Sequence, residues 1–114
     1  MIAAAAARGI GVMGIRAVQA GALTNMIDRP LPDHHPEVLD YAKAASYRAL
    51  AADLGMSAAA LGHRYALAMP GLDTVVLGVK NRAELADCLA AAEAGPLPQD
   101  LVARVDACFA VPAI

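Results

Sequence analysis

The stretch TVVLGVKNRAELADCL, residues 74–89, decides the fold that we predict for this chain. Near its start stand three apolar residues in a row, Val75, Val76 and Leu77, shortly after a Pro-Gly pair that indicates a turn. A short continuous apolar run is typical of a strand that is buried on both faces, as in a parallel sheet. The sequence therefore predicts a buried strand over residues 73–79.

A helix is expected to follow this strand. Asn81 is a favourable N-cap residue, and Glu84, three residues later, completes an approximate capping box. The predicted helix, RAELADCLAAAEA, occupies residues 82–94 and runs up to Gly95, and the prolines that come next cannot continue it. Residues 73–95 thus form one predicted strand–helix unit.

A second strand is predicted near the N-terminus, over residues 9–18. Its sequence, GIGVMGIRAV, lies between an alanine-rich helix predicted over residues 2–8 and a loop predicted over residues 19–25. Residues 26–36 hold three prolines and show no periodicity, which predicts an extended loop.

Helices are predicted for most of the remaining chain. A single helix is expected over residues 37–54, ended by Gly55, and another over residues 57–69 with Ser57 as its N-cap. A last helix is predicted over residues 99–110. The first of these helices is expected to have an apolar face that comprises Val38, Leu39, Ala42, Ala45 and Ala49.

Strands that alternate with helices imply an α/β fold with parallel strands and right-handed crossovers. Two parallel strands alone would both be edge strands with unpaired backbone groups. The chain is 59% hydrophobic, largely through alanine, but only 4% aromatic, so it lacks large anchors for a compact core. We therefore expect residues 1–114 to form a single incomplete domain, either a piece of a larger fold or a subunit.

Charge and composition exclude several classes of partner. The formal net charge is −2 and no basic block is present, so we expect no nucleic-acid partner. Arg8 and Arg16 interrupt the apolar N-terminal stretch, which argues against a membrane span, and a basic signal-peptide start is missing. A cytoplasmic location is expected. Cys88 and Cys108 show neither CxxC nor metal-ligand spacing and are expected to be small buried hydrophobes.

The segment GIGVMG, residues 9–14, matches the glycine pattern of a dinucleotide-binding loop. That loop must follow a strand and open a helix, so that a pyrophosphate meets the helix N-terminus. Here an alanine-rich segment precedes the glycines, and they lie within the predicted strand. The favoured interpretation is close packing of small residues, and a small Rossmann-like nucleotide binder is kept as a third hypothesis.

Two segments together resemble the C-terminal part of the aldo-keto reductase family. Residues 8–24, RGIGVMGIRAVQAGALT, resemble its seventh barrel strand and the loop that follows. Residues 74–89 resemble its eighth strand and the helix that grips the 2′-phosphate of NADP, and residues 48–78 resemble the helix that leads to that strand. The resemblance covers nearly the whole chain, in the family's order and spacing.

This resemblance implies a partial (β/α)8 TIM barrel of two βα units plus extra helices, mostly helical. It implies NADP(H) as the cofactor and, in a complete barrel, reduction of a small carbonyl substrate by hydride transfer. The cofactor-binding residues that it implies lie near the end of one of the two predicted strands or in the segment that follows it. They are Gly78, Val79, Lys80, Asn81, Arg82, Asp87, Arg16 and Gly21.

Elementary electrostatics fits this assignment. Lys80 and Arg82 flank the start of the helix at residues 82–94, and a helix N-terminus beside two cations favours an anion such as the 2′-phosphate. Gly78 has no side chain and would let backbone approach a ligand. The alternative for Lys80, Asn81 and Arg82 is an ordinary exposed helix start.

The chain departs from the family at several positions. Glu84 stands where the family often has an arginine, and Cys88 stands where an asparagine contacts adenine, whereas Asp87 matches an acidic position. Many members also have an aromatic residue near Ile15 and a proline near Ala17, and this chain has neither.

The family's catalytic Asp, Tyr, Lys and His come from the first half of the barrel, and none of them aligns with residues 1–114. We therefore name no catalytic residue and expect this chain to be inactive alone. His63 lies in an apolar helical pattern and is expected to be structural. His34 and His35 lie in the proline-rich loop, where a metal site would need further ligands.

Two classes of function follow. The first is the NADP(H)-contacting part of a carbonyl-reducing oxidoreductase. The second is a non-catalytic helical assembly or interaction module, derived from a barrel, that self-associates through its exposed strand edges.

Overall fold

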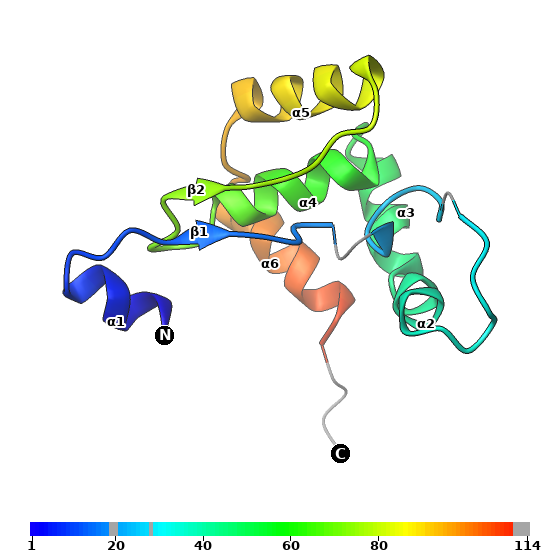
Figure 1. Cartoon of the computed structure of the whole chain (residues 1–114), viewed down its shortest axis with the longest axis horizontal. Coiled ribbons are helices and arrows are strands. Elements are labelled where there is room, and N and C mark those ends of the chain that lie inside the picture. The colour runs from blue at the N-terminus through cyan, green and yellow to red at the C-terminus, as the bar shows by residue number, and fades with distance from the viewer. Residues whose placement is uncertain (19–20, 28, 111–114) are drawn as a thin grey trace.

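The computed structural model describes residues 1–18, 21–27 and 29–110, and Figure 1 shows how their helices and strands are arranged. Most of the described chain is helical. In chain order the elements are α1 (Ile2–Ala7), β1 (Met13–Gly14), α2 (Pro36–Lys43), α3 (Ala45–Asp53), α4 (Ala58–Leu67), β2 (Thr74–Val75), α5 (Arg82–Ala94) and α6 (Gln99–Cys108).

The sheet of the described residues consists of β1 and β2, which run parallel (Figure 1). Met13 pairs with Thr74 and Gly14 with Val75. Next to these pairs, the amide of Asp73 donates to the carbonyl of Val12 at 3.0 Å, and the Val12 amide donates to the Asp73 carboxylate at 2.7 Å. The predicted parallel pairing is confirmed, although both strands are shorter than residues 9–18 and 73–79.

The predicted burial of the second strand on both faces is wrong for this chain. Val76 is 48% exposed and Leu77 is 41% exposed, although both follow β2 directly. A strand in a parallel sheet is buried when helices and neighbouring strands cover it. Among the described residues β2 pairs with β1 alone, so its apolar side chains have too few neighbours to be covered.

The predicted single helix over residues 37–54 is also wrong. The chain turns at Ala44, whose amide donates to the carbonyls of both Asp40 and Tyr41, so that α2 ends and α3 begins in a new direction. Ala44 is fully buried at this turn. Alanine is a strong helix former, and only the tertiary packing around Ala44 makes it a breaking point.

This turn also overturns the predicted apolar face. The buried positions on α3 are Tyr47, Leu50 and Ala51. The predicted face is instead half-buried or exposed, and its members are Val38, Leu39, Ala42, Ala45 and Ala49. Because α2 and α3 point in different directions, one periodic stripe does not describe both.

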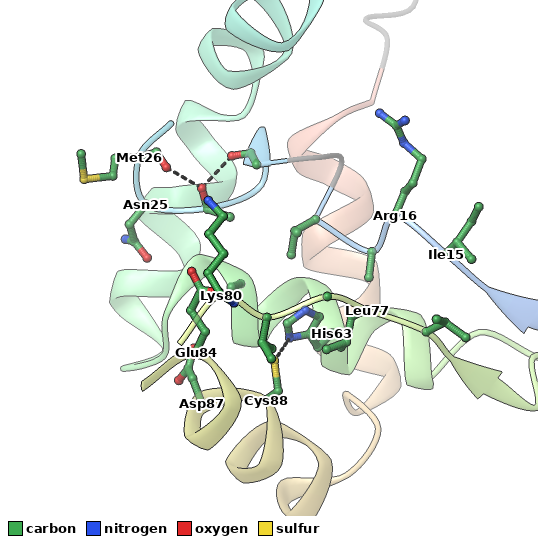
Figure 2. Close-up of a pocket in the computed structure, with 18 of the residues that line it drawn as sticks. Ile15, Arg16, Asn25, Met26, His63, Leu77, Lys80, Glu84, Asp87 and Cys88 are labelled. Atoms are coloured by element: carbon green, nitrogen blue, oxygen red, sulfur yellow. Dashed lines mark hydrogen bonds between the residues drawn. The ribbon is translucent and has the colours of Figure 1, made fainter. Parts of the chain in front are cut away.

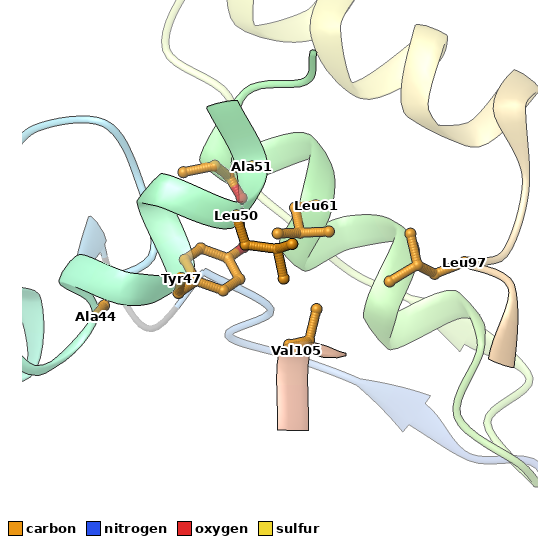
Figure 3. Close-up of a cluster of buried hydrophobic side chains, with 8 residues drawn as sticks. Ala44, Tyr47, Leu50, Ala51, Leu61, Leu97 and Val105 are labelled. Atoms are coloured by element: carbon orange, nitrogen blue, oxygen red, sulfur yellow. Dashed lines mark hydrogen bonds between the residues drawn. The ribbon is translucent and has the colours of Figure 1, made fainter. Parts of the chain in front are cut away.

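The core lies between α3, α4 and α6, to one side of the sheet (Figure 3). Its largest fully buried side chains are Tyr47, Leu61 and Leu97. The hydroxyl of Tyr47 donates to the carbonyl of Ala58, and its ring lies 5.8 Å from that of Phe109, centroid to centroid. Burying a leucine such as Leu61 stabilises the fold by roughly 1.5–3 kcal/mol, so the helices carry most of the hydrophobic stabilisation.

The predicted helix caps are confirmed. The amide of Ala60 donates to Ser57 Oγ at 3.0 Å at the start of α4, and the amide of Glu84 donates to Asn81 Oδ1 at 2.9 Å at the start of α5. Gly55 follows α3 with a φ of 70°, a conformation that favours glycine. These local signals therefore place the starts of α4 and α5 and the end of α3 correctly.

The remaining elements largely agree with the predictions. The observed α5 has the predicted bounds, and α1, α4 and α6 are shorter than predicted by one to three residues. Of the predicted loop over residues 19–25, residues 19 and 20 lie outside the described residues, as does residue 28 of the following loop. No helix in the described part of the chain is long and apolar enough to span a bilayer.

Candidate functional site

A cavity of about 830 Å³ opens where the two strands end (Figure 2). One wall consists of described residues that follow β1, namely Ile15, Arg16, Ala17, Val18, Gly21, Thr24, Asn25, Met26 and Arg29. The other wall is the segment from Val76 to Lys80, which follows β2. Helix α4 contributes His63 to the lining. Ligands of open and closed α/β folds bind at the carboxyl ends of parallel strands, so the cavity lies where such a fold places its ligand.

The cavity brings together most of the predicted cofactor-binding residues. Those that line it are Arg16, Gly21, Gly78, Val79, Lys80 and Asp87. Asn81 and Arg82 are not part of its lining. Asn81 caps α5, and Arg82 is the first residue of that helix.

The backbone at Arg16 is unusual. Its φ is 59°, in the left-handed region that non-glycine residues rarely adopt. Such a conformation costs on the order of 1 kcal/mol, and it occurs two residues after β1, in the lining of the cavity. Figure 2 shows the guanidinium of Arg16 and the ammonium of Lys80 on different walls. The strained turn therefore separates two cations across the space.

Gly78 has room around it. A Cβ atom built on Gly78 would meet no atom within 4 Å, and Gly78 is exposed. The glycine is therefore not required by the packing of the chain itself. Its lack of a side chain leaves space on the cavity side, which is the condition for close approach of a ligand to the backbone.

The start of α5 already holds one negative charge. The Glu84 carboxylate accepts a hydrogen bond of 2.7 Å from the amide of Lys80, the residue before the N-cap Asn81, so the predicted capping box forms only approximately. The amides of Arg82 and Ala83 have no hydrogen-bond partner among the described residues. This helix N-terminus therefore keeps two donors for an anion, with Lys80 beside them and Glu84 opposing them.

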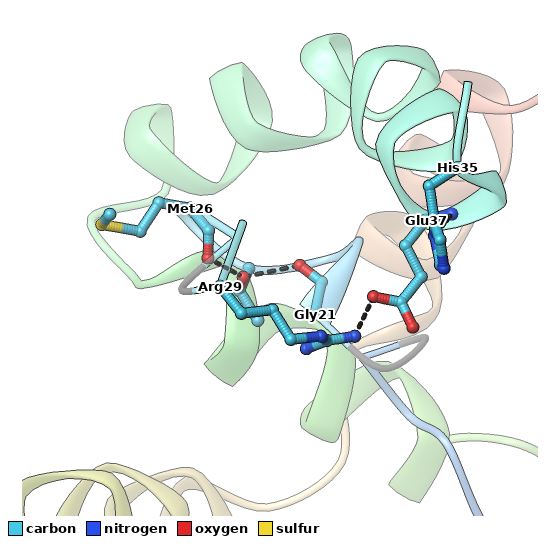
Figure 4. A network of polar contacts seen from close by, with 6 residues as sticks. Gly21, Met26, Arg29, His35 and Glu37 are labelled. Atoms are coloured by element: carbon cyan, nitrogen blue, oxygen red, sulfur yellow. Dashed lines mark hydrogen bonds and ion pairs between the residues drawn. The ribbon is translucent and has the colours of Figure 1, made fainter. Parts of the chain in front are cut away.

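Polar contacts stabilise the loop that follows β1 and forms one wall of the cavity (Figure 4). The hydroxyl of Thr24 donates to the Gly21 carbonyl at 2.6 Å or to that of Met26 at 2.8 Å. Arg29 forms an ion pair with Glu37 of α2, so its charge is largely compensated. Arg16 and Lys80 also line the cavity and bring further positive charge to it.

Sequence reasoning missed the pair formed by His63 and Cys88. Cys88 Sγ on α5 lies 4.0 Å from His63 Nδ1 on α4, and both residues line the cavity (Figure 2). Burial lowers the pKa of His63, against the opposing effect of Asp87. Burial and then the charges of Asp87 and Glu84 raise the pKa of the Cys88 thiol. At neutral pH the pair is thus a neutral imidazole beside a protonated thiol.

His63, which the sequence predicts to be structural, lies on α4 and is 8% exposed, and its structural role stays a prediction. The expectation that Cys88 and Cys108 are buried is wrong, because both are only half-buried. Cys88 is partly exposed because its side chain lines the cavity. Cys108 is the last residue of α6. A histidine at an apolar position of a helix was the one signal in the sequence that pointed to this pair.

Asp87 and Asn25, which line the cavity, accept hydrogen bonds from residues at the N-terminus of α4. The Ser57 hydroxyl donates to the Asp87 carboxylate at 3.0 Å, and the Ala58 amide donates to Asn25 Oδ1 at 3.2 Å. The N-terminus of α4 thus contacts both α5 and the loop after β1. No pattern in the sequence identified Asn25.

The Rossmann-like hypothesis is wrong. The glycines of GIGVMG lie between α1 and the end of β1, and the next helix of the described chain begins only at Pro36. No helix N-terminus is therefore available beside them for a pyrophosphate. Within residues 1–18, 21–27 and 29–110, no three His, Cys, Asp or Glu side chains are grouped so that they could hold a metal ion. His35 Nδ1 instead accepts the amide of Glu37 and caps α2.

Comparison with known proteins agrees with this geometry. No curated protein sequence matches the chain significantly. The sequence model of the aldo/keto reductase family matches residues 1–110, which is nearly the whole chain. With a parallel strand pair, a cavity at its carboxyl end and this match, the chain belongs to the aldo/keto reductase family.

Proposed function

We propose that this chain is the C-terminal, NADP(H)-contacting part of a carbonyl-reducing aldo/keto reductase. The family has the TIM-barrel fold, generally uses NAD(P)H and contains carbonyl reductases. The observation that carries the proposal is the cavity at the carboxyl ends of β1 and β2, which gathers Arg16, Gly21 and the segment from Gly78 to Lys80. Two strands that end at one ligand cavity are what a barrel segment provides.

The residues present fit a dinucleotide phosphate. The unpaired amides of Arg82 and Ala83 point from the start of α5, where the helix dipole favours an anion. Lys80 adds a cation at the same end, and Arg16 supplies another on the opposite wall. The open space at Gly78 leaves room for a ligand beside the backbone. These residues would hold NADP(H) through its phosphate groups.

Bound NADPH would supply the hydride for carbonyl reduction. The chain's own part would be to orient the cofactor and to exclude water from its adenosine end. Ser57, through its hydrogen bond to Asp87, fixes the carboxylate that faces the cavity. We assign no proton donor to any residue of this chain, and we propose that the chain does not reduce carbonyls by itself.

A binding experiment tests the cofactor site. NADP⁺ titrated into the full chain, followed by calorimetry, should show saturable binding that Lys80→Ala combined with Arg82→Ala weakens by at least about tenfold. The matched control is Lys43→Ala combined with Arg104→Ala, which removes two exposed cations away from the cavity. Equal weakening by both double variants would mean that net charge, and not this site, governs binding.

An activity experiment tests the second part of the proposal. The chain is mixed with NADPH and a reactive aldehyde, and absorbance of NADPH is followed against a buffer control. We expect no steady consumption of NADPH. Steady turnover above the control would contradict the proposal that the chain is inactive alone.

One observation favours the assembly module as a second candidate function. Large apolar side chains remain exposed on and beside the strands, among them Met13, Ile15, Val76 and Leu77. An apolar surface next to open strand edges is a typical site of association. Light scattering after size exclusion separates the candidates: an oligomer that is indifferent to NADP⁺ supports the module, and a monomer that binds NADP⁺ supports the cofactor site.

A further inference from the structure

We propose that Cys88 and His63 form a thiol–imidazole pair that makes the cavity a covalent modification site for α,β-unsaturated carbonyl compounds. The first argument is position. Sγ of Cys88 and Nδ1 of His63 are 4.0 Å apart, and both side chains line the cavity. A small electrophile that enters this space therefore reaches the thiol with a base beside it.

The second argument is the state of His63. Its side chain is more than nine-tenths buried, and the thiol is its only hydrogen-bonding contact in the part of the chain that the structure describes. Its other ring nitrogen thus has no partner there. It is not among the buried atoms of the described residues that lack a partner, so it keeps access to solvent. An imidazole with one nitrogen beside the thiol and the other open to solvent is suited to accept or relay a proton during a reaction in the cavity.

The third argument is the class of electrophile that the lining accepts. Ile15, Val76 and Leu77 supply apolar surface, and these residues lie on the two walls that follow the strands. Thiols react readily with soft carbon electrophiles, and the reacting form is the thiolate. A conjugated carbonyl compound with an apolar chain matches both the surface and the nucleophile.

The reaction needs no further reagent. The Cys88 sulfur forms a bond to the β-carbon of the conjugated carbonyl compound, while the carbon–carbon π bond breaks. The thiol proton passes to His63 Nδ1 and then reaches the α-carbon, either directly or through solvent. No group leaves and nothing is oxidised or reduced overall, so the product is a thioether with a saturated carbonyl chain.

The adduct has a consequence that rests on the proposed function. A carbon chain attached to Cys88 occupies the same cavity as the phosphate end of NADP(H), because Cys88 and Lys80 line it together. Modification and cofactor binding should therefore exclude each other. Reactive carbonyl compounds that modify Cys88 would therefore lower the affinity of the chain for NADP(H).

The experiment uses both cysteines of the chain, one as the site and the other as an internal control. The full chain is treated briefly with N-ethylmaleimide, a conjugated imide, and the rates at Cys88 and Cys108 are read by peptide mass spectrometry. Cys108 is also half-buried, but it lies on α6 outside the cavity lining, with its Sγ against the Arg104 carbonyl. Both thiols thus experience the same reagent in the same tube.

We expect His63→Leu to slow labelling of Cys88 by about tenfold at pH 7, since a neighbouring base contributes at least that much to proton transfer. Labelling of Cys108 should not change. If a folded His63→Leu variant labels Cys88 as fast as the unsubstituted chain, the pair is overturned. The pair is also overturned if Cys88 reacts only after urea unfolds the protein.

A second variant keeps the test decisive if His63→Leu does not fold. Asp87→Asn removes a negative charge that raises the pKa of the Cys88 thiol, and it should speed Cys88 labelling by about 3–10-fold. An unchanged rate at Cys88 would contradict a cavity thiol controlled by these neighbours.

Saturating NADP⁺ distinguishes this inference from the proposed function. Protection of Cys88 but not of Cys108 supports both. Labelling of Cys88 that depends on His63 but is not slowed by NADP⁺ overturns the proposed cofactor site and leaves the thiol–imidazole pair standing. If the chain binds NADP⁺ but its Cys88 does not react, the thiol–imidazole pair is overturned and the proposed cofactor site stands.

Discussion

The helical half and the strand half of this chain are packed very differently. Between α3, α4 and α6, Tyr47 and Leu61 are almost completely removed from solvent. By contrast, Met13 on β1 is 70% exposed and Val76, directly after β2, is 48% exposed. Helices form their backbone hydrogen bonds within themselves, whereas a strand depends on its neighbours. The difference teaches that the helices of this chain can bury a core among themselves while the two strands leave apolar side chains exposed.

The largest expected effect compares a leucine from each half. Leu61→Ala should lower the free energy of unfolding by about 2–5 kcal/mol, because it leaves a cavity in a fully buried position. Leu77→Ala should lower it by less than about 1 kcal/mol, because Leu77 is 41% exposed. Urea unfolding followed by circular dichroism measures both. Equal losses would mean that the strand half is buried in solution, for example by self-association.

The next effect concerns His63, which lies where the two halves meet. Its pKa is lowered in the folded chain, so below the unfolded value of about 6.5 the unfolded chain binds more protons. Stability should therefore fall as the pH drops from 7.5 to 5.5, by at most about 1.4 kcal/mol per pH unit from this residue. His63→Leu should flatten the profile of unfolding free energy against pH by that amount.

His34 and His35 remain in the variant, so the difference between the two profiles isolates His63. Identical slopes for the two chains would contradict a buried neutral imidazole at this position.

A smaller effect compares two glycines. A Cβ atom on Gly62 would lie 3.0 Å from both the Ala17 carbonyl and the Tyr47 hydroxyl, whereas one on Gly78 would meet nothing within 4 Å. Gly62→Ala should destabilise the chain by about 1 kcal/mol, after the gain in helix propensity is counted. Gly78→Ala should change stability by less than about 0.5 kcal/mol but weaken NADP⁺ binding by at least about threefold.

Thermal unfolding and a NADP⁺ titration of the two glycine variants separate these roles. Strong destabilisation by Gly78→Ala would show that the residue serves the packing of the chain and not the space for a ligand.

The smallest expected effect concerns the negative charge of Glu84 at the start of α5. Glu84→Gln keeps an acceptor for the Lys80 amide but removes the negative charge at the start of α5. NADP⁺ affinity should rise by about 3–10-fold, while NAD⁺, which lacks the 2′-phosphate, should bind as before. Parallel titrations of the two nucleotides measure this. If the affinities for NADP⁺ and NAD⁺ rise equally, Glu84 does not repel the 2′-phosphate but a phosphate that both nucleotides carry.

Local chemistry made much of the fold predictable. Ser57 and Asn81 cap their helices because each has a side-chain acceptor within reach of an unpaired amide. Gly55 follows its helix because it tolerates a positive φ. The order of strand, glycine and helix start likewise predicts that Gly78 and Lys80 lie near a strand end, and both line the cavity. Their cofactor-binding role comes from the family resemblance and stays a prediction.

Tertiary contacts decided the rest. The helix ends at Ala44 because the packing of the core requires a turn there. Alanine is a good helix former, so its identity does not predict this turn. His63 and Cys88 stand far apart in the sequence and meet only because α4 packs against α5.

By itself, then, the sequence determined most of the helical segments, the caps that Ser57 and Asn81 provide, and the parallel order of the two strands. The caps and helical segments depend on interactions between near neighbours in the chain. Only the tertiary structure decided that Val76 stays exposed, that six of the predicted residues share one cavity, and that a thiol faces an imidazole within it. Burial and side-chain meetings depend on which elements cover one another, and that information is distributed over the whole fold.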